Sequence, residues 1–325
     1  MILGGDIGGT KTNIAFFEPK DNQLMLKVVE KYPSSQHSSL DEIVLDFIKK
    51  HSLKVQTACF GIAGAIHNER VKTTNLPWEV SAESLSKALS GIDVHLINDL
   101  EANAWGIDAL KEEELVSLNS PKQIIKGNRA LISAGTGLGE AGLYHSEGKY
   151  HPFASEGGHA DFAPRNDKEI ALFKYLAKPF GHVSFERVLS GHGLYNIYQF
   201  LNDYNNRSSS KEISEKFKND DPAKVISEYA LENKDVTCEE ALDMMVSFYG
   251  SEAGNMALRF MAYGGVYLGG GIAPKILSKL QSPLFLEAFL AKGRFRSLLE
   301  SIPIKVILND KTALIGAAYC ALSRL

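Results

Sequence analysis

Cysteine is scarce in this chain of 325 residues, and an excess of basic charge is missing. The three cysteines, Cys59, Cys238 and Cys320, are far apart and form no Cys-x-x-Cys pair. This spacing excludes a zinc ribbon or a thioredoxin-like redox site and indicates a reducing compartment. The 35 lysines and arginines stand against 39 aspartates and glutamates, a net charge of −4. Such a balance disfavours nucleic acid or an anionic membrane as the main partner.

Long apolar runs are missing as well. The first residues include an acid, Asp6, and no basic segment, so we expect no secretory signal. The most apolar stretch, residues 261–273, is short and interrupted by glycine, so we expect no membrane-spanning helix. We therefore expect a cytoplasmic protein that binds neither nucleic acid nor a membrane.

The composition is that of an ordinary folded protein, with 44% hydrophobic and 23% charged residues. A chain of 325 residues is long enough for one hydrophobic core to divide into two. Strand and helix signals alternate along it, which favours an α/β architecture. The acidic run at residues 111–114 and the loop signals that follow it, up to Gly127, mark the predicted boundary between two domains.

Two hairpins with glycine tips are predicted. Residues 2–6 and 13–17 have the composition of strands on either side of the turn at residues 8–10. The same scheme recurs over residues 130–145, around the turn at residues 135–137. The recurrence indicates an internal duplication.

Helix and strand signals continue through the rest of the chain. Residues 202–220 are polar, and we interpret them as a solvated loop or a frayed helix end. Predicted strands lie at residues 58–62, 94–97 and 304–308. Predicted helices lie at residues 40–50, with Ser39 and Glu42 as a capping box, and at residues 311–322, with Asp310 as cap. Two more are predicted between them, one that begins after Asp221-Pro222 and one that ends at Phe260, with Thr237 and Glu240 as its capping box.

Glycine-rich segments at residues 4–10, 134–139 and 264–271 are candidate phosphate sites. Glycine lets a backbone approach a ligand closely, and converging turn amides bind anions. A tight turn alone also explains each segment taken singly. Three of them together favour a nucleotide site.

Two common nucleotide motifs do not fit these segments. Residues 137–142 match Gly-x-Gly-x-x-Gly, but Gly148 and Pro152 leave no room for the helix that a dinucleotide-binding fold needs there. Residues 4–12 lack the Gly-Lys-Ser/Thr order of a P-loop. The sequence therefore predicts phosphate binding at hairpin tips.

Taken in order, several motifs resemble those of the bacterial glucokinase family, in the actin-like sugar-kinase superfamily. They are Gly5-Asp6-Ile7-Gly8-Gly9-Thr10, Thr74-Asn75-Leu76-Pro77-Trp78, Ile97-Asn98-Asp99, Ala134-Gly135-Thr136-Gly137-Leu138-Gly139, Glu156-Gly157-Gly158-His159 with the residues up to Pro164, Glu186-Arg187-Val188-Leu189-Ser190-Gly191 and Gly269-Gly270-Gly271-Ile272. The resemblance implies an α/β fold of the two-lobed actin-like ATPase (ribonuclease H-like) type, with a mixed sheet flanked by helices in each lobe and the active site in the cleft between the lobes. It implies a small domain of residues 1–109 and 309–325, and a large domain of residues 110–308.

The same resemblance implies an activity. This is the ATP- and Mg²⁺-dependent phosphorylation of D-glucose to D-glucose 6-phosphate, which feeds glycolysis, by a homodimer. A kinase for another hexose, such as mannose or N-acetylmannosamine, is an alternative. A non-catalytic sugar-sensing regulator is a second alternative, but the acidic balance lacks the basic surface that DNA binding requires.

Asp99 is the candidate catalytic base. Transfer to a sugar hydroxyl needs a carboxylate that orients the attacking oxygen and accepts its proton. Asp99 follows a predicted strand, at the end where open α/β sheets gather their ligands. A simpler interpretation is that Asp99 only caps the helix that follows. The resemblance implies the catalytic role.

A sugar site needs several hydrogen-bonding groups from different segments. The candidates are Asn98, Asp99, Glu156, His159 and Glu186. The resemblance implies that Glu156, His159 and Glu186 bind the hydroxyls near the anomeric carbon, with Asn98 and Asp99 at the other end. Taken singly, His159 is also explained by a hydrogen bond within its loop, and Glu186 by a solvated helix face.

On the nucleotide side the resemblance implies contacts from all three glycine segments. Asp6 would organise hydrated Mg²⁺, which one or two carboxylates and phosphate oxygens usually hold. The implied ATP-binding residues are Gly5, Asp6, Ile7, Gly8, Gly9, Thr10, Gly135, Thr136, Gly137, Gly265, Gly269 and Gly270. One departure is His192, which stands where the family pattern usually has proline.

Overall fold

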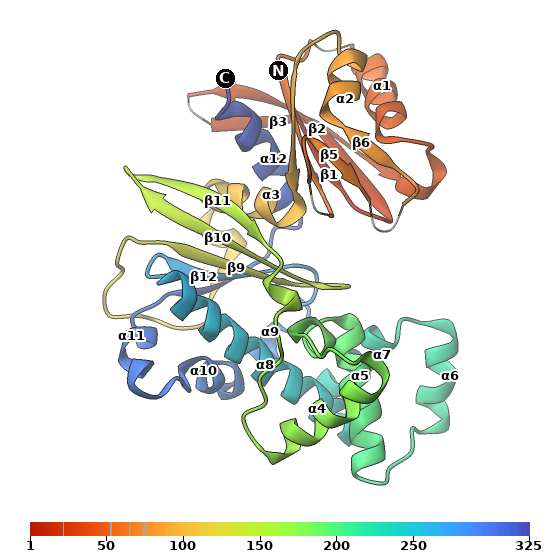
Figure 1. Cartoon of the computed structure of the whole chain (residues 1–325), viewed down its shortest axis with the longest axis vertical. Coiled ribbons are helices and arrows are strands. Elements are labelled where there is room, and N and C mark those ends of the chain that lie inside the picture. The colour runs from red at the N-terminus through yellow and green to blue at the C-terminus, as the bar shows by residue number, and fades with distance from the viewer. Residues whose placement is uncertain (22, 53, 65, 74–75) are drawn as a thin grey trace. The chain divides into compact units, whose positions relative to one another are not determined.

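The computed structural model describes residues 1–21, 23–52, 54–64, 66–73 and 76–325 (Figure 1). Thr74 and Asn75 of the motif at residues 74–78 lie outside these residues. The chain divides into two compact units, the first made of residues 1–114, 151–154 and 309–325, and the second of residues 115–150 and 155–308. The domains predicted from the sequence are residues 1–109 with 309–325 and residues 110–308. These domain bounds stay a prediction.

The first unit is built on a sheet with the strand order β3-β2-β1-β4-β7. Strand β1 pairs antiparallel with β2 and parallel with β4, and β4 pairs parallel with β7. The hairpin predicted at the start of the chain is confirmed. The strands of this unit are β1 (Ile2–Ile7), β2 (Lys11–Lys20), β3 (Gln23–Pro33), β4 (Thr57–Ile62), β5 (Arg70–Lys72), β6 (Glu79–Ser81) and β7 (Asp93–Asn98), of which β5 and β6 form a separate two-stranded ladder.

Helices cover both faces of this sheet because successive strand residues point to opposite sides. Leu3 and Phe60 belong to the core that α1 (Leu40–His51) and α2 (Ala82–Ala88) cover. Their strand neighbours Ile2 and Cys59 belong to the core under α3 (Asp99–Gly106) and α12 (Thr312–Leu322). Helix α1 begins as predicted, since the Ser39 side chain accepts a hydrogen bond from the Glu42 amide.

The second unit repeats this scheme in a sheet with the order β11-β10-β9-β12-β13-β8. Strand β9 pairs antiparallel with β10 and parallel with β12, and β12 pairs parallel with β13. The first five strands therefore follow the order seen in the first unit, as the predicted duplication requires. The strands of this sheet are β8 (Leu115–Ser117), β9 (Arg129–Ala134), β10 (Leu138–Ser146), β11 (Lys149–Ser155), β12 (Gly265–Gly269) and β13 (Ile304–Ile307), of which residues 151–154 in β11 are assigned to the first unit.

Helix α8 (Val236–Phe260) is the long central helix of the second unit (Figure 1). Its buried side packs against the sheet. The Tyr249 hydroxyl donates to backbone carbonyls of both β9 and β12. The other helices are α4 (Asp167–Phe180), α5 (Gly191–Tyr204), α6 (Lys211–Asn219), α7 (Pro222–Leu231), α9 (Leu277–Leu280), α10 (Pro283–Leu290) and α11 (Arg296–Glu300). Among the residues that the structure describes, no helix is long and apolar enough to cross a lipid bilayer.

Three predictions about helices are wrong. Residues 211–219 form helix α6 instead of a loop, because Ser210 caps it and Ile213 is buried. Helix α8 is capped by Asp235, which accepts from the Cys238 amide, so the capping box predicted at residues 237–240 does not form. Helix α12 has no cap from Asp310, because the Asn309 side chain accepts from the Lys311 amide in its place.

Candidate active site

The glycine turn of the first unit joins β1 to β2. The Gly8 amide donates to the Lys11 carbonyl at 2.9 Å, which closes the turn. Ser34 holds it from behind, because its hydroxyl donates to the Gly8 carbonyl at 2.8 Å and its amide to the Thr10 carbonyl at 3.1 Å. Gly9 is half-buried and Thr10 is exposed. The turn is therefore fixed on the protein side, and Thr10 is at the surface where a phosphate can reach it.

Gly5 and Ile7, two of the predicted nucleotide residues, lie in the core of the first unit. A Cβ added to Gly5 would collide with the Phe60 ring, and Ile7 is 2% exposed among the residues that α1 covers. Their inward direction leaves only their backbone atoms for a ligand. A role for Gly5 and Ile7 in ATP binding stays a prediction.

Asp6 lies at the end of β1, half-buried beside other carboxylates. The Asn13 side chain donates to its Oδ2 at 3.1 Å. Burial raises the pKa of Asp6 to about 6, and the charges of Asp99 and Asp310 add to the rise while the Asn13 bond opposes it. An excess of negative charge next to the turn predicted to bind phosphate suits a divalent cation.

A cation at Asp6 would need ligands from outside the protein. Among the described residues, no three aspartate, glutamate, histidine or cysteine side chains are grouped so that they could hold a metal ion. Hydrated Mg²⁺ meets this condition, because it keeps several waters and takes phosphate oxygens as ligands. The residues present therefore fit an ion held on the nucleotide better than one held by a protein cage.

Asn98 and Asp99 stand at the junction of β7 and α3. Asn98 is the cap of α3, since its Oδ1 accepts from the Leu100 amide at 2.9 Å while its Nδ2 donates to the Gly64 carbonyl at 3.3 Å. Asp99 is the first residue of the helix, and its Oδ1 also accepts from the Leu100 amide at 2.9 Å. Asn98 is therefore the N-cap, and Asp99 offers a second acceptor to the same first-turn amide.

The glycine turn of the second unit joins β9 to β10. The Gly135 amide donates to the Gly137 carbonyl at 2.9 Å, and Thr136 is exposed at the tip. Glu186, in the short 3₁₀ helix η5 (Phe185–Arg187), lies directly behind this turn. Its Oε2 accepts from the Leu138 amide at 2.9 Å, and a Cβ on Gly137 would lie 2.5 Å from the same oxygen. A predicted sugar residue and a predicted phosphate turn are thus in direct contact.

The turn at residues 156–159 also packs against Leu138. Residues 157–159 form the 3₁₀ helix η4 (Gly157–His159), in which the His159 amide donates to the Glu156 carbonyl at 3.0 Å. Gly158 is buried against β10, where an added Cβ would collide with the Leu138 carbonyl oxygen. Glu156 and His159 are exposed. Three motifs that are far apart in sequence therefore meet around the backbone of Leu138.

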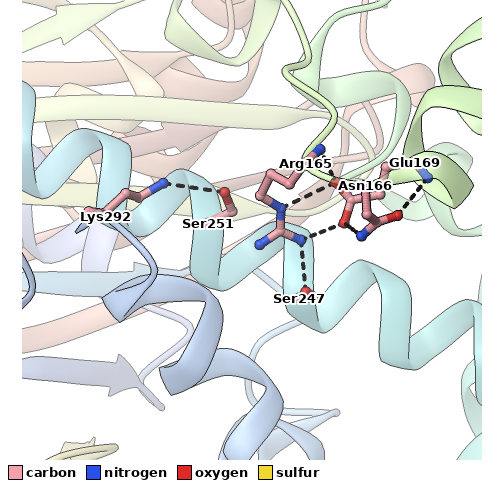
Figure 2. Close-up of polar contacts among 6 residues, drawn as sticks. All are labelled: Arg165, Asn166, Glu169, Ser247, Ser251 and Lys292. Carbon is pink, nitrogen blue, oxygen red and sulfur yellow. Dashed lines mark hydrogen bonds and ion pairs between the residues drawn. The ribbon is translucent and has the colours of Figure 1, made fainter.

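A charged cluster fixes the chain just after this turn (Figure 2). Arg165 donates from its backbone amide to Oε2 of Glu169 at 2.7 Å and from Nη2 to Oε1 at 2.8 Å. The same Nη2 donates to the hydroxyl of Ser247 on α8 at 2.8 Å. Asn166 caps α4 by accepting from the Glu169 amide at 3.0 Å. The segment that carries Glu156 and His159 is thus attached to the long central helix.

A pocket of about 640 Å³ opens on the other side of the glycine turn of the second unit. This volume is in the range of small-molecule sites. Its lining consists of backbone, apolar and charged groups from five segments, and it includes Gly135, Thr136, Gly191, His192, Asp221, Ala223, Lys224, Met245, Gly271, Ile272 and Lys275. The predicted residues Gly135 and Thr136 line it, as does Gly271 of the third glycine segment.

The third glycine segment contributes mainly through its backbone. Gly265 and Gly269 are the buried ends of β12, whereas Gly270 is exposed with a φ of +79°. A Cβ on Gly270 would collide with the Ala134 carbonyl, whose oxygen also accepts from the Ile272 amide at 3.2 Å. The segment is thereby joined to the end of β9, next to the glycine turn.

Sequence reasoning missed the pocket residues of helices α5 and α7 and Lys275. The sequence places Asp221 only at the start of a helix, and it does cap α7, since its Oδ1 accepts from the Ala223 amide at 3.0 Å. Nothing in the spacing of His192, Lys224 and Lys275 relates these residues to one another. The departure at His192 was the one local signal.

Comparison with known proteins identifies the family. The sequence model described as Glucokinase matches residues 3–324. The chain belongs to the glucokinase family. A protein named glucokinase from Nostoc punctiforme is 42% identical to it, over 99% of this chain and 98% of the relative.

Solved structures agree with this membership. A glucokinase from an Antarctic psychrotroph has a TM-score of 0.87 at 30% identity, over 99% of this chain and 98% of that one. A glucokinase of the related ROK family from Streptomyces griseus, solved with glucose and AMPPNP, has a TM-score of 0.62 at 19% identity over 99% of both chains. The actin-like sugar-kinase fold expected from the sequence is confirmed.

Proposed function

We propose that this member of the glucokinase family transfers the γ-phosphoryl group of ATP to the 6-hydroxyl of D-glucose. One observation carries the proposal. The turn at residues 135–137 lines the pocket with Gly135 and Thr136, and on its other side Gly137 contacts Glu186. Donor phosphates and sugar are therefore expected to meet at this turn.

The sugar site would be formed by exposed or half-buried polar side chains on fixed backbone. Glu156, His159 and Glu186 belong to the motifs that meet at Leu138, and we assign them to the hydroxyls near the anomeric carbon. Glu186 still has its Oε1 for a sugar hydroxyl, since Oε2 is the atom that accepts from Leu138. We assign Asn98 and Asp99 to the hydroxyls at the other end of the sugar.

Asp99 is proposed as the catalytic base. Its carboxylate would accept the proton of the 6-hydroxyl as the new oxygen–phosphorus bond forms and the bond from phosphorus to ADP breaks. Asp6 is the residue that would hold Mg²⁺ through water. The ion, when bound, supplies charge neutralisation on the phosphates.

The nucleotide would occupy the 640 Å³ pocket with its adenosine. Thr136 and the amides of its turn would bind phosphate oxygens, as would Thr10 with Gly8 and Gly9. Lys275 and Lys224, which line the pocket, carry the opposite charge to the phosphates. Gly265, Gly269 and Gly270 would contribute backbone surface only.

The test is glucose-dependent release of ADP from Mg-ATP by the purified protein, with identification of the product. We expect D-glucose to stimulate release and D-glucose 6-phosphate to accumulate in equal amount. The same assay with D-mannose and with N-acetylmannosamine gives their kcat/KM for comparison with that of glucose. A higher kcat/KM for either of these sugars would identify that sugar, and not glucose, as the substrate. Glucose binding without any turnover would favour a sugar sensor.

Two further expectations belong to this proposal. The homodimer implied by the family resemblance predicts twice the chain mass of 35.6 kDa in size-exclusion chromatography with light scattering. The cytoplasmic location and the supply of glycolysis stay predictions, which cell fractionation and growth of a deletion strain on glucose would test.

A further inference from the structure

Glu140 is a buried acid next to the turn at residues 156–159. The proposed reaction gives this acid no role. It is the third residue of β10, only 1% exposed, and it stands opposite the apolar Ile132 of β9. A Cβ on Gly157 would collide with its Oε2 and lie 2.9 Å from its Cδ. Its Oε1 has no hydrogen-bond partner among the described residues. The carboxyl group thus fills the space behind the turn that carries Glu156 and His159.

A second buried acid, Glu252 on α8, acts on Glu140. Glu252 is fully buried, and it accepts from Arg259 Nη1 and from Asn255 Nδ2, both at 2.7 Å. Burial raises the pKa of Glu252, and the hydrogen bonds from Asn255 and Arg259 and the charge of Arg259 oppose that rise. Burial, and after it the charge of Glu252, raise the pKa of Glu140 to about 8, whereas Arg259 acts in the opposite direction. Glu140 is mostly a neutral acid at pH 7.

The groups of β9 and η4 that pack against Glu140 are uncharged. Strand β9 presents Ile132, and η4 presents the backbone of Gly157, with Glu156 and His159 of the turn exposed. Lys292 is connected to Glu252 through Asn255, to which it donates at 2.6 Å. It also donates to Ser251 at 3.4 Å (Figure 2). Burial lowers the pKa of Lys292 to about 8.

We propose that Glu140 is a positioning residue for the sugar site, whose neutral carboxyl group supports the turn at residues 156–159 in its binding conformation. An ionised Glu140 would be repelled by the charge of Glu252 more than it is attracted by that of Arg259, and among the described residues no lysine, arginine or histidine forms an ion pair with it. The repulsion would displace the turn and weaken glucose binding. This inference rests on the proposed role of Glu156 and His159 as sugar ligands.

The first test is the pH dependence of KM for glucose in the wild type and in Glu140→Gln. If only the neutral form supports the turn, the competent fraction falls about tenfold between pH 7 and pH 9, and KM for glucose rises about tenfold. KM for ATP serves as the internal reference. Glutamine has the same shape without a titrating group, so Glu140→Gln should match the wild type at pH 7 and stay flat to pH 9.

The control variant is Glu215→Gln, which removes an exposed acid of α6 and should keep the wild-type profile. A rise of KM that persists in Glu140→Gln would assign the titration to another group, Lys292 included, and overturn the inference. A wild type without glucose-dependent turnover would instead refute the proposed function. The two failures are therefore distinguishable.

A second test uses the contact between Glu140 and Gly157 and does not depend on pH. Gly157 is not among the residues with positive φ, so its backbone tolerates alanine. Gly157→Ala alone should raise KM for glucose at least about tenfold, because the new Cβ meets the carboxyl group. Glu140→Ala alone should also raise KM for glucose, because the turn loses its support. In the double variant the rise should be smaller than the product of the two single rises, because both changes act on one contact. A double variant whose rise equals that product would show that the contact does not position the turn.

Discussion

Replacing Asp6 by asparagine should make the metal-free protein more stable while it removes most of the activity. Burial and the neighbouring charges of Asp99 and Asp310 raise the pKa of Asp6 to about 6, so the folded protein resists ionisation of this group. Asparagine removes the charge and keeps an oxygen that accepts from Asn13, the bond that Asp6 makes at 3.1 Å. The same change removes the carboxylate proposed to hold Mg²⁺.

The size of the effect follows from the two pKa values. A pKa of about 6 in the folded state against the ordinary 3.8 corresponds to about 3 kcal/mol. Because the folded value is the higher one, the folded state binds the proton more tightly. The destabilisation is fully present above pH 6 and disappears below pH 3.8. Asp6→Asn should therefore gain about 3 kcal/mol at pH 7.5 and about 1 kcal/mol at pH 4.5.

The assay is calorimetric melting in EDTA at pH 7.5 and pH 4.5. For a chain of this length, 3 kcal/mol corresponds to a rise in Tm of about 4 °C. Asp220→Asn, at an exposed aspartate next to α7, is the matched control and should leave Tm within about 1 °C. A variant that melts at or below the wild type at pH 7.5, or whose gain is equal at both pH values, would refute the reasoning from the buried charge.

Three other substitutions test separate parts of the structure. Asp99→Asn should lower kcat at least about 100-fold while calorimetry still detects glucose binding, and near-normal turnover would exclude Asp99 as the base. Ala223→Trp fills the pocket and should raise KM for ATP at least about tenfold with KM for glucose unchanged; equal effects on both would place the nucleotide elsewhere. Gly316→Ala puts a Cβ against the Ala102 carbonyl of α3, so urea unfolding should show a loss of about 2 kcal/mol, and a neutral result would contradict this close helix packing.

Elements with local signals could be predicted from the sequence. The first hairpin follows from two apolar runs around Gly8, and the antiparallel pairing of β1 with β2 needs no information from elsewhere in the chain. Helix α1 follows from the cap Ser39 and from the spacing of Ile43, Val44 and Phe47, all of which are buried. In each case the residues that specify the element are close together in the sequence.

Features that depend on tertiary packing could not be predicted. Helix α6 buries only Ile213, so its composition is that of a solvated loop. The pocket takes its lining from segments around residues 135, 192, 224 and 275, which no spacing relates. Glu140 is one acid in a strand, and its burial depends on Gly157 of a separate turn, which nothing in its own sequence surroundings indicates.

Three of the motif glycines also have a packing role that the sequence does not show. An added Cβ at Gly137, Gly157 or Gly158 would meet Glu186, Glu140 or the Leu138 carbonyl, respectively, and each of these is a protein atom. Here the missing side chain first lets a second segment of the protein come close. The neighbours of these glycines, Thr136, Glu156 and His159, are the exposed residues. A glycine-rich sugar-kinase motif therefore specifies the packing behind the site, and the polar residues between its glycines are the ones to test for contact with the substrates.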